Sequence, residues 1–135
     1  IATVCARIHQ PGELFDPNVV KVTRDREGFA LYFSRAPIPW HREAFRSVER
    51  ESVGLPDDTV WFRHIGLYAY RVAVLRRFPR LEPALIEQAE ALEQLRALWH
   101  GIRIQVVEAT EAPPPGVDTE ADLARVAAEL AISDE

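Results

Sequence analysis

Hydrophobic residues alternate with polar ones in some segments of the chain and recur at helical spacing in others. Runs rich in β-branched and aromatic residues, bounded by turn-forming residues, predict five strands, at 2–8, 19–25, 29–35, 60–71 and 102–110. The sequence "REG" between the second and third runs predicts a tight glycine turn. Residues 36–58 contain three prolines and no sustained period, so we expect an exposed excursion with at most one short helix.

Two segments have the period of an amphipathic helix. In 83–100 the apolar residues at helical spacing are Leu85, Ala89, Leu92, Leu95 and Trp99, with Pro83 suited to the first turn and Gly101 to the position after the last. In 117–130 Thr119 is a natural N-cap, with Asp122 three residues later. Strands interleaved with helices predict an α/β or α+β fold, formed by residues 1–135 as a single domain or half-domain.

Composition narrows the classes of function. The 135 residues are 47% hydrophobic, enough for a real core, and the net charge of −5 argues against a general binder of nucleic acid or anionic membrane. The single cysteine, Cys5, forms no internal disulfide, which fits a reducing compartment. No apolar run approaches the roughly 20 residues of a membrane helix, and no signal-peptide pattern is present. Because the chain lacks methionine and opens on the strand-like "IATVCARI", we expect a fragment of a longer protein.

The strand "WFRHIGLYAYR" (61–71) carries the most distinctive candidate site. Strand alternation predicts a core face made of Ile65, Leu67 and Ala69. The other face holds His64, Gly66, Tyr68 and Tyr70, with Gly66 leaving a gap between an imidazole and a phenol. This face is either the floor of a pocket for a polyhydroxylated ligand or a face covered by solvent or a partner.

For several charged residues elsewhere in the chain, two interpretations are open. The polar face of 83–100, with Glu87, Glu90, Glu93 and Gln94, is a solvated surface or a set of acceptors for sugar hydroxyls. Asp118 either serves the start of the 117–130 helix or holds a metal ion. Arg35 either clamps a carboxylate or flanks a strand end. Cys5 has no activating neighbour in sequence, and there is no Walker loop, dinucleotide fingerprint, zinc spacing or Ser/His/Asp signature.

Taken together, four segments resemble the bacterial 3-deoxy-manno-octulosonate cytidylyltransferases. They are "FDPNVVKVTRDREGFALYFSRAPIPW", "FRHIGLYAYR", "LEQLRALWHG" and "GVDTEADLARV", whose order and spacing agree over essentially the whole chain. The match is to the C-terminal half of that family. The resemblance implies an α/β fold: the C-terminal half of a Rossmann-like, three-layer nucleotide-diphospho-sugar-transferase fold with a mixed sheet. It implies that the nucleotide-binding half, with the first metal-binding aspartate, is absent.

The resemblance also implies a reaction and roles. CTP and an acidic eight-carbon sugar would give the CMP-sugar and pyrophosphate for lipopolysaccharide synthesis, with Mg²⁺ as cofactor, in a cytoplasmic homodimer without nucleic-acid or membrane partners. Asp118 would be catalytic and hold Mg²⁺. The sugar pocket would be lined by His64, Tyr68, Glu90, Glu93, Gln94 and, near the sugar carboxylate, Arg35.

Some alternatives stay open at this point. The chain has "ALIE" (84–87) where the family often has Ser-Pro-Leu-Glu, which puts the start of the helix in question. The sugar can equally be a related acid such as the 8-amino analogue, or the chain can be a standalone non-catalytic dimerisation or sugar-binding module. We expect residues 1–135 alone to be inactive and, because a sheet edge would be open, to self-associate.

Overall fold

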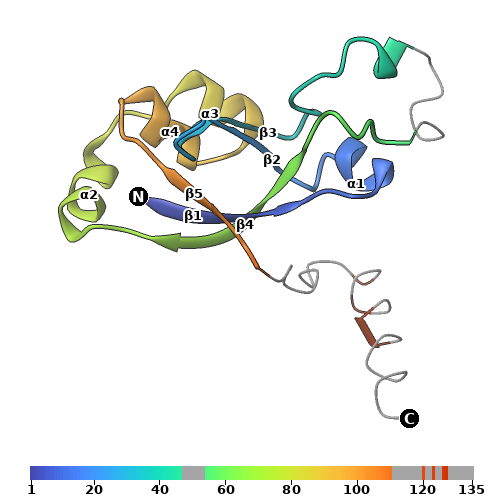
Figure 1. Ribbon diagram of the computed structural model, residues 1–135. Coiled ribbons are helices and arrows are strands. Elements are labelled where there is room, and N and C mark those ends of the chain that lie inside the picture. The colour runs from blue at the N-terminus through green and yellow to red at the C-terminus, as the bar shows by residue number, and fades with distance from the viewer. Residues whose placement is uncertain (47–53, 111–119, 121–122, 124–125, 128–135) are drawn as a thin grey trace.

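The computed structural model describes residues 1–46, 54–110, 120, 123, 126 and 127 (Figure 1). One mixed sheet has the strand order β3-β2-β4-β1-β5, in which β1 pairs with β5 in parallel and the other neighbours are antiparallel. The strands are β1 (Ala2–Arg7), β2 (Lys21–Arg24), β3 (Ala30–Ser34), β4 (Phe62–Ala69) and β5 (Gln105–Glu108). The five predicted strands and the α/β fold with a mixed sheet are confirmed.

The turn between β2 and β3 shows why glycine stands there. Gly28 has a φ of +82°, and a Cβ at this position would lie 2.6 Å from Nε2 of Gln105 on β5. Asp25 closes the turn, since its Oδ1 accepts hydrogen bonds from the backbone N–H groups of Glu27 and Phe29 at 2.9 and 2.8 Å. The predicted glycine turn is therefore confirmed, and only a residue without a side chain fits it.

The helices are short, and two of them carried no sequence prediction. They are α1 (Pro11–Phe15), α2 (Val72–Arg77), α3 (Leu85–Glu90) and α4 (Gln94–Trp99), with 3₁₀ turns η1 (Ala44–Arg46) and η3 (Phe78–Arg80). A helix of one to two turns leaves too few residues for a period to emerge, which is why α1 and α2 were missed. The described part of 36–58 is irregular apart from η1, as predicted.

The prediction of one continuous helix over 83–100 is wrong. Ala91 adopts the left-handed conformation, with a φ of +52°, and the backbone N–H groups of Ala91 and Leu92 both donate to the carbonyl of Glu87. This pattern closes a helix, and a second helix starts only at Gln94. The break separates the predicted apolar stripe: Leu92 and Leu95 are buried, whereas Leu85, Ala89 and Trp99 are exposed.

Helices α3 and α4 lie together on one side of the sheet (Figure 1). The core between helix and sheet consists of buried side chains from both layers: Cys5, Val22, Phe33, Leu92, Leu95, Ala97, Ile104 and Val106. A second, smaller cluster lies around α1 and the excursion, with Ile8, Leu14, Phe45 and Trp61. The face of the sheet toward α3 and α4 is called the inner face below.

The side of β4 that faces the core is the opposite of the one predicted. Leu67 is 65% exposed and Ala69 is exposed, while His64 and Tyr68 lie on the inner face. Val107 on β5 is likewise 53% exposed on the outer face. Periodicity separated the two sides of the strand correctly, but the aliphatic side of β4 is the uncovered one.

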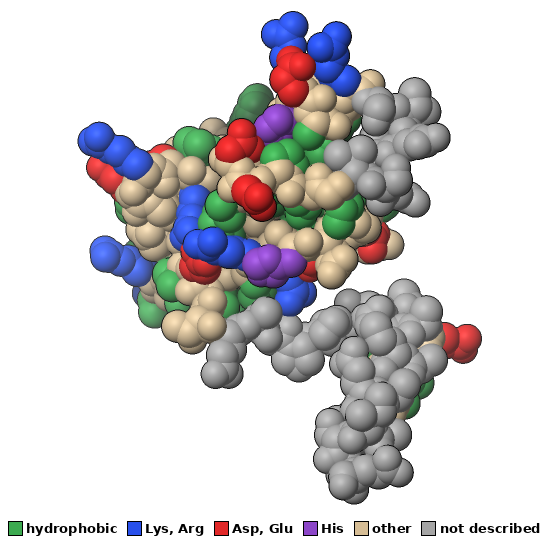
Figure 2. Space-filling model, turned by 45° about the vertical axis from the view of Figure 1, so that its right-hand side comes forward, with side chains coloured by type: hydrophobic (Ala, Val, Ile, Leu, Met, Phe, Trp, Pro, Cys, Tyr) green, Lys and Arg blue, Asp and Glu red, His purple; other side chains and the backbone are tan. Residues whose placement is uncertain are grey.

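Most of the predicted helix 117–130 lies outside the described residues, including Asp118, Thr119 and Asp122. The four residues of that segment that are described are helical. Within the described residues, none of the helices combines the length and apolarity that crossing a membrane requires. On the described part of the face seen in Figure 2, charged side chains of both signs lie at several separate places and do not form one continuous basic patch.

Candidate functional site

A bulge in β4 builds the candidate site. Along β1, Thr3 pairs with Tyr68 and the next residue, Val4, pairs with Ile65, so Gly66 and Leu67 of β4 have no partner on β1. In a regular strand, residues four apart are separated by about 13 Å. Here the rings of His64 and Tyr68 approach to 5.3 Å between centroids. Bulges redirect side chains in this way and are frequent beside functional sites.

The gap that the sequence predicted beside Gly66 does not exist. Gly66 lies in the bulge and is exposed, and a Cβ added to it would contact nothing within 4 Å. The bulged residues leave the ladder, so the imidazole and the phenol close up on each other on the inner face. The two predicted side chains are brought together, in contact rather than across a gap.

His64 is held on the inner face by its neighbours. Its Nε2 lies 2.9 Å from Oγ1 of Thr3, and its ring packs edge-on against Phe33 with centroids 5.0 Å apart. Burial lowers the pKa of His64 to about 4, because the charged imidazolium is costly away from water. At neutral pH this side chain is an uncharged hydrogen-bonding group and a weak base.

Tyr68 carries an unsatisfied polar atom. Its hydroxyl is buried beside the Thr3 side chain, and no hydrogen bond of good geometry satisfies it among the described residues. Burial, followed by the proximity of Tyr70 and Glu93, raises the pKa of Tyr68 well above its usual range, so the phenol stays protonated. Buried hydroxyl groups are nearly always paired in folded proteins, so an orphan at a cluster of polar groups indicates a position for a ligand atom.

Glu93 reaches the same region from the residue just before α4. Glu93 is exposed and lies close enough to Tyr68 and Tyr70 that its negative charge contributes to raising the pKa of both phenols. Gln94 is buried at 4% exposure. Because α3 ends at Ala91 and α4 starts afresh, α4 packs against β3 instead of continuing along the line of α3.

Glu90 and Arg35 form hydrogen bonds with each other and with neighbouring backbone groups. The carboxylate of Glu90 accepts from Oγ of Ser34 at 2.6 Å and from the backbone N–H of Arg35 at 2.9 Å. The Nε of Arg35 donates to the carbonyl oxygen of Glu90 at 2.8 Å, and its Nη1 donates to the carbonyl of Pro17 at 3.0 Å. These contacts join the end of β3 to the end of α3, so both side chains are already engaged within the fold.

Glu87 is also a structural residue, and the surface interpretation of it was wrong. It is 9% exposed, it accepts from the backbone N–H of Ala84 at 3.1 Å, and it forms a two-pronged ion pair with Arg96 of α4. The Arg96 guanidinium holds the pKa of Glu87 below its ordinary value. This carboxylate therefore caps α3 and ties it to α4.

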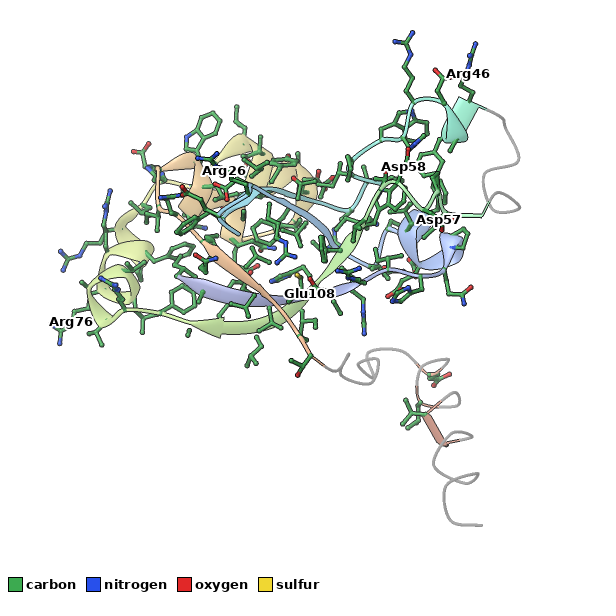
Figure 3. All side chains as sticks on the ribbon, in the orientation of Figure 1. Arg26, Arg46, Asp57, Asp58, Arg76 and Glu108 are labelled. Atoms are coloured by element: carbon green, nitrogen blue, oxygen red, sulfur yellow. The ribbon has the colours of Figure 1, made fainter. Side chains whose placement is uncertain are left out.

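The described residues offer no metal centre. Among residues 1–46 and 54–110, no three His, Cys, Asp or Glu side chains come close enough together to hold a metal ion. The predicted metal ligand, Asp118, lies outside the described residues. The charged residues labelled in Figure 3 do not gather into one further site. Arg46, Asp57 and Asp58 of the excursion lie at one end of the molecule, and Arg76 on α2 lies at the other.

Two buried polar residues, Thr3 at the site and Lys21 on β2, escaped the sequence analysis. Thr3 is 2% exposed and binds His64 and the bulge. Lys21 is fully buried, its Nζ donating to the carbonyls of Asp16 and Val19 at 2.8 and 2.5 Å, and burial lowers its pKa. A polar residue between aliphatic ones, as in "VVKV" and "ATVC", is the only signal the sequence contains for either.

Two proteins with similar sequences carry the same description. The chain is 58% identical over 126 residues to the 3-deoxy-manno-octulosonate cytidylyltransferase of Nitrosococcus oceani, covering 93% of this chain and 48% of that protein. It is 55% identical over 130 residues to that of Halorhodospira halophila, covering 96% and 49%. The chain thus spans about half the length of these relatives.

A solved structure shares the fold. The chain is similar to a CMP:2-keto-3-deoxy-manno-octonic acid synthetase complexed with CTP, with a TM-score of 0.79 and 40% sequence identity, over 98% of this chain and 49% of that one. The family model described as cytidylyltransferase matches residues 1–104, which include β1 to α4 and the bulge in β4. The sequence resemblance is therefore confirmed, and the chain belongs to the cytidylyltransferase family.

Proposed function

We propose that the protein acts as a 3-deoxy-manno-octulosonate cytidylyltransferase and that the described residues form its sugar-binding part. In the reaction, the anomeric hydroxyl oxygen of the sugar forms a bond to the α-phosphorus of CTP. The bond from that phosphorus to the bridging oxygen breaks, pyrophosphate leaves with the electron pair, and the hydroxyl proton is released. The product would serve lipopolysaccharide synthesis.

One observation carries the proposal beyond family membership. His64, Tyr68 and Glu93 gather on the inner face, and the buried Tyr68 hydroxyl has no well-formed hydrogen bond among the described residues. Together they offer an imidazole, a protonated phenol and a carboxylate, the kinds of group that bind a polyhydroxylated ligand. We include Gln94 in the proposal because it is buried and follows Glu93 directly in the chain.

In this proposal these side chains bind the substrate and do not abstract its proton. With a pKa of about 4, His64 is too weak a base to remove a hydroxyl proton efficiently at neutral pH. Glu90 and Arg35 contribute indirectly in this proposal, by holding the end of β3 against the end of α3. Binding energy of this kind orients the attacking hydroxyl, a contribution that depends on fixed geometry.

The metal is a separate part of the proposal. Mg²⁺ bound through Asp118, which lies outside the described residues, would neutralise phosphate oxygens of CTP. Among the described residues, no group of three His, Cys, Asp or Glu side chains could hold the ion. Chelation with EDTA should abolish pyrophosphate release, and added Mg²⁺ should restore it. Activity that persists in EDTA would remove Mg²⁺ from the proposal.

The partner and location are also proposals. A homodimer is supported by the uncovered apolar side chains on the outer face of β4 and β5, Leu67 and Val107. Light scattering of the intact protein tests it directly, and a monomer at micromolar concentration would contradict it. A cytoplasmic location is supported by the single, buried and unbridged Cys5.

The main test is pyrophosphate release by the protein expressed from its complete coding sequence. CTP with 3-deoxy-manno-octulosonate should support turnover, and the 8-amino analogue and other acidic sugars form the comparison panel. A preference for the 8-amino analogue would correct the substrate while keeping the reaction. Absence of turnover with every acidic sugar would refute the proposed function.

A further inference from the structure

The hydroxyl of Thr3 lies at the centre of the candidate site, and the proposed function gives it no role. Thr3 is on β1 and almost fully buried. Its Oγ1 lies 2.9 Å from Nε2 of His64, 2.9 Å from the carbonyl oxygen of Leu67 and 3.2 Å from the carbonyl oxygen of Ile65. All three partners belong to β4, and they span the bulge from one end to the other.

Counting protons assigns the direction of these hydrogen bonds. A threonine hydroxyl has one proton to donate, and a carbonyl oxygen can only accept. If Nε2 of His64 were unprotonated, three acceptors would compete for that one proton, and unshielded lone pairs would face each other at hydrogen-bonding distance. If Nε2 carries a proton, it donates to Thr3, and Thr3 in turn donates to the carbonyls of the bulge.

Because His64 is neutral, the proton on Nε2 also determines whether its other ring nitrogen, Nδ1, is protonated. With a pKa of about 4, caused by burial, the ring carries a single proton at neutral pH. Among the described residues near His64, Cys5, Tyr68 and Tyr70 have pKa values raised by burial, so they stay uncharged. The charged groups are Glu93, which acts on the two tyrosines, and the ion pair of Arg24 with Glu108, which acts on Cys5. A proton on Nε2 therefore leaves Nδ1 bare.

We propose that Thr3 is a positioning residue that holds His64 as the Nε2–H tautomer, so that Nδ1 accepts a hydrogen bond from a hydroxyl group of the substrate. Nδ1 makes no hydrogen bond to the described residues. The neighbouring Tyr68 supplies a protonated hydroxyl, which lies beside Thr3 and has no well-formed hydrogen bond among the described residues. The site thus presents one acceptor and one donor to a ligand hydroxyl, which can both donate and accept. That the ligand is a sugar rests on the proposed function; the tautomer does not.

The bulge links this tautomer to the shape of the site. The same hydroxyl that accepts from His64 donates to the carbonyl of Leu67, one of the two residues that leave the ladder. Removing it loosens the bulge and releases the imidazole together. Thr3→Val has nearly the same shape without the hydroxyl, and Thr3→Ser keeps the hydroxyl without the methyl group, so the two variants form a matched pair.

The tautomer is measured directly by NMR on the intact protein with ¹⁵N-labelled histidine. The chain has four histidines, and His64→Gln identifies the signals of His64 by their loss. At pH 7 we expect a protonated Nε2 and an unprotonated Nδ1 in the wild type and in Thr3→Ser. In Thr3→Val the two nitrogens should move toward averaged shifts, and the KM for the sugar should rise about tenfold, the loss of one hydrogen bond, with the KM for CTP unchanged.

Two results would overturn the proposal: a protonated Nδ1 in the wild type, or an unchanged tautomer in folded Thr3→Val. If Thr3→Val does not fold, the wild-type spectrum still decides the tautomer, and Thr3→Ser decides whether the hydroxyl is sufficient to hold it. Adding the sugar separates this inference from the proposed function. If His64 is the Nε2–H tautomer but its Nδ1 signal does not change when the sugar is added, the tautomer is confirmed and the sugar is refuted as the ligand of Nδ1.

Discussion

The carboxylate of Glu90 joins the end of β3 to the end of α3, and its removal should destabilise the protein strongly. Glu90→Ala takes the acceptor away from two donors at once, the Ser34 hydroxyl and the backbone N–H of Arg35. Glu93, three residues later, is the matched control, because it is exposed and its carboxylate makes no hydrogen bond to the described residues. The two substitutions remove the same side chain from neighbouring turns.

The magnitude follows from the hydrogen bonds that are lost. A hydrogen bond to a charged group contributes about 1.5–3 kcal/mol. The Ser34 hydroxyl can rotate toward another acceptor, whereas the N–H of Arg35 cannot, so the two losses do not add fully. We expect Glu90→Ala to lower the free energy of unfolding by about 3 kcal/mol, and Glu93→Ala to change it by less than about 0.5 kcal/mol.

Urea denaturation of the intact protein measures the difference. With a slope of about 2 kcal/mol per molar urea, Glu90→Ala should lower the midpoint by about 1.5 M, and Glu93→Ala should leave it unchanged. Pyrophosphate release should depend on Glu93 although stability does not. Folded Glu93→Ala should lose affinity for the sugar, because a carboxylate beside Tyr68 and Tyr70 is gone. Equal midpoints for the two variants would refute the assignment of Glu90 to the fold.

A double-mutant cycle isolates the contact itself. In a Ser34→Ala background, Glu90→Ala should cost less than in the wild type, with a coupling energy of at least about 0.5 kcal/mol. Glu90→Gln retains one acceptor for the N–H of Arg35 and should fall between the wild type and Glu90→Ala. A cycle without coupling would show that the 2.6 Å contact to Ser34 contributes nothing to stability.

Three further predictions concern α3. Ala91→Gly should stabilise the protein by about 0.5–1 kcal/mol in urea denaturation, because a left-handed φ of +52° strains alanine and suits glycine; a lower midpoint would contradict this. Ala84→Ser should add about 1 kcal/mol, because Ala84 has the extended N-cap conformation and serine supplies the missing acceptor; no gain would show that the cap is not formed. Because Arg96 lowers the pKa of Glu87 in the folded state, its contribution is present above the unfolded pKa and is lost as pH falls through the folded pKa. Below about pH 4.5 the wild type should therefore lose stability more steeply than Glu87→Gln, and parallel pH curves would refute it.

The sequence by itself determined the strands, the hairpin and the family. Period-two runs and the glycine of "REG" are local signals, since a strand alternates its side chains and Gly28 alone tolerates its turn. The segments "YFSRAPIPW" and "RHIGLYAYR" indicated the family because residue identity and spacing are preserved in order. The pairing of His64 with Tyr68 in one site was also visible, since both lie on one side of a strand.

Only the tertiary structure decided which side of that strand is covered and what each carboxylate does. Leu67 is exposed because α3 and α4 lie over the other face of the sheet, and no period reports where another element packs. Glu87, Glu90 and Glu93 look alike in sequence, yet one is paired with Arg96, one holds Ser34 and Arg35, and one stays exposed near the tyrosines. Their roles depend on partners distant in the chain, as does the bulge that Thr3 of β1 stabilises in β4. The local pattern therefore identifies candidates, and long-range contacts assign their functions.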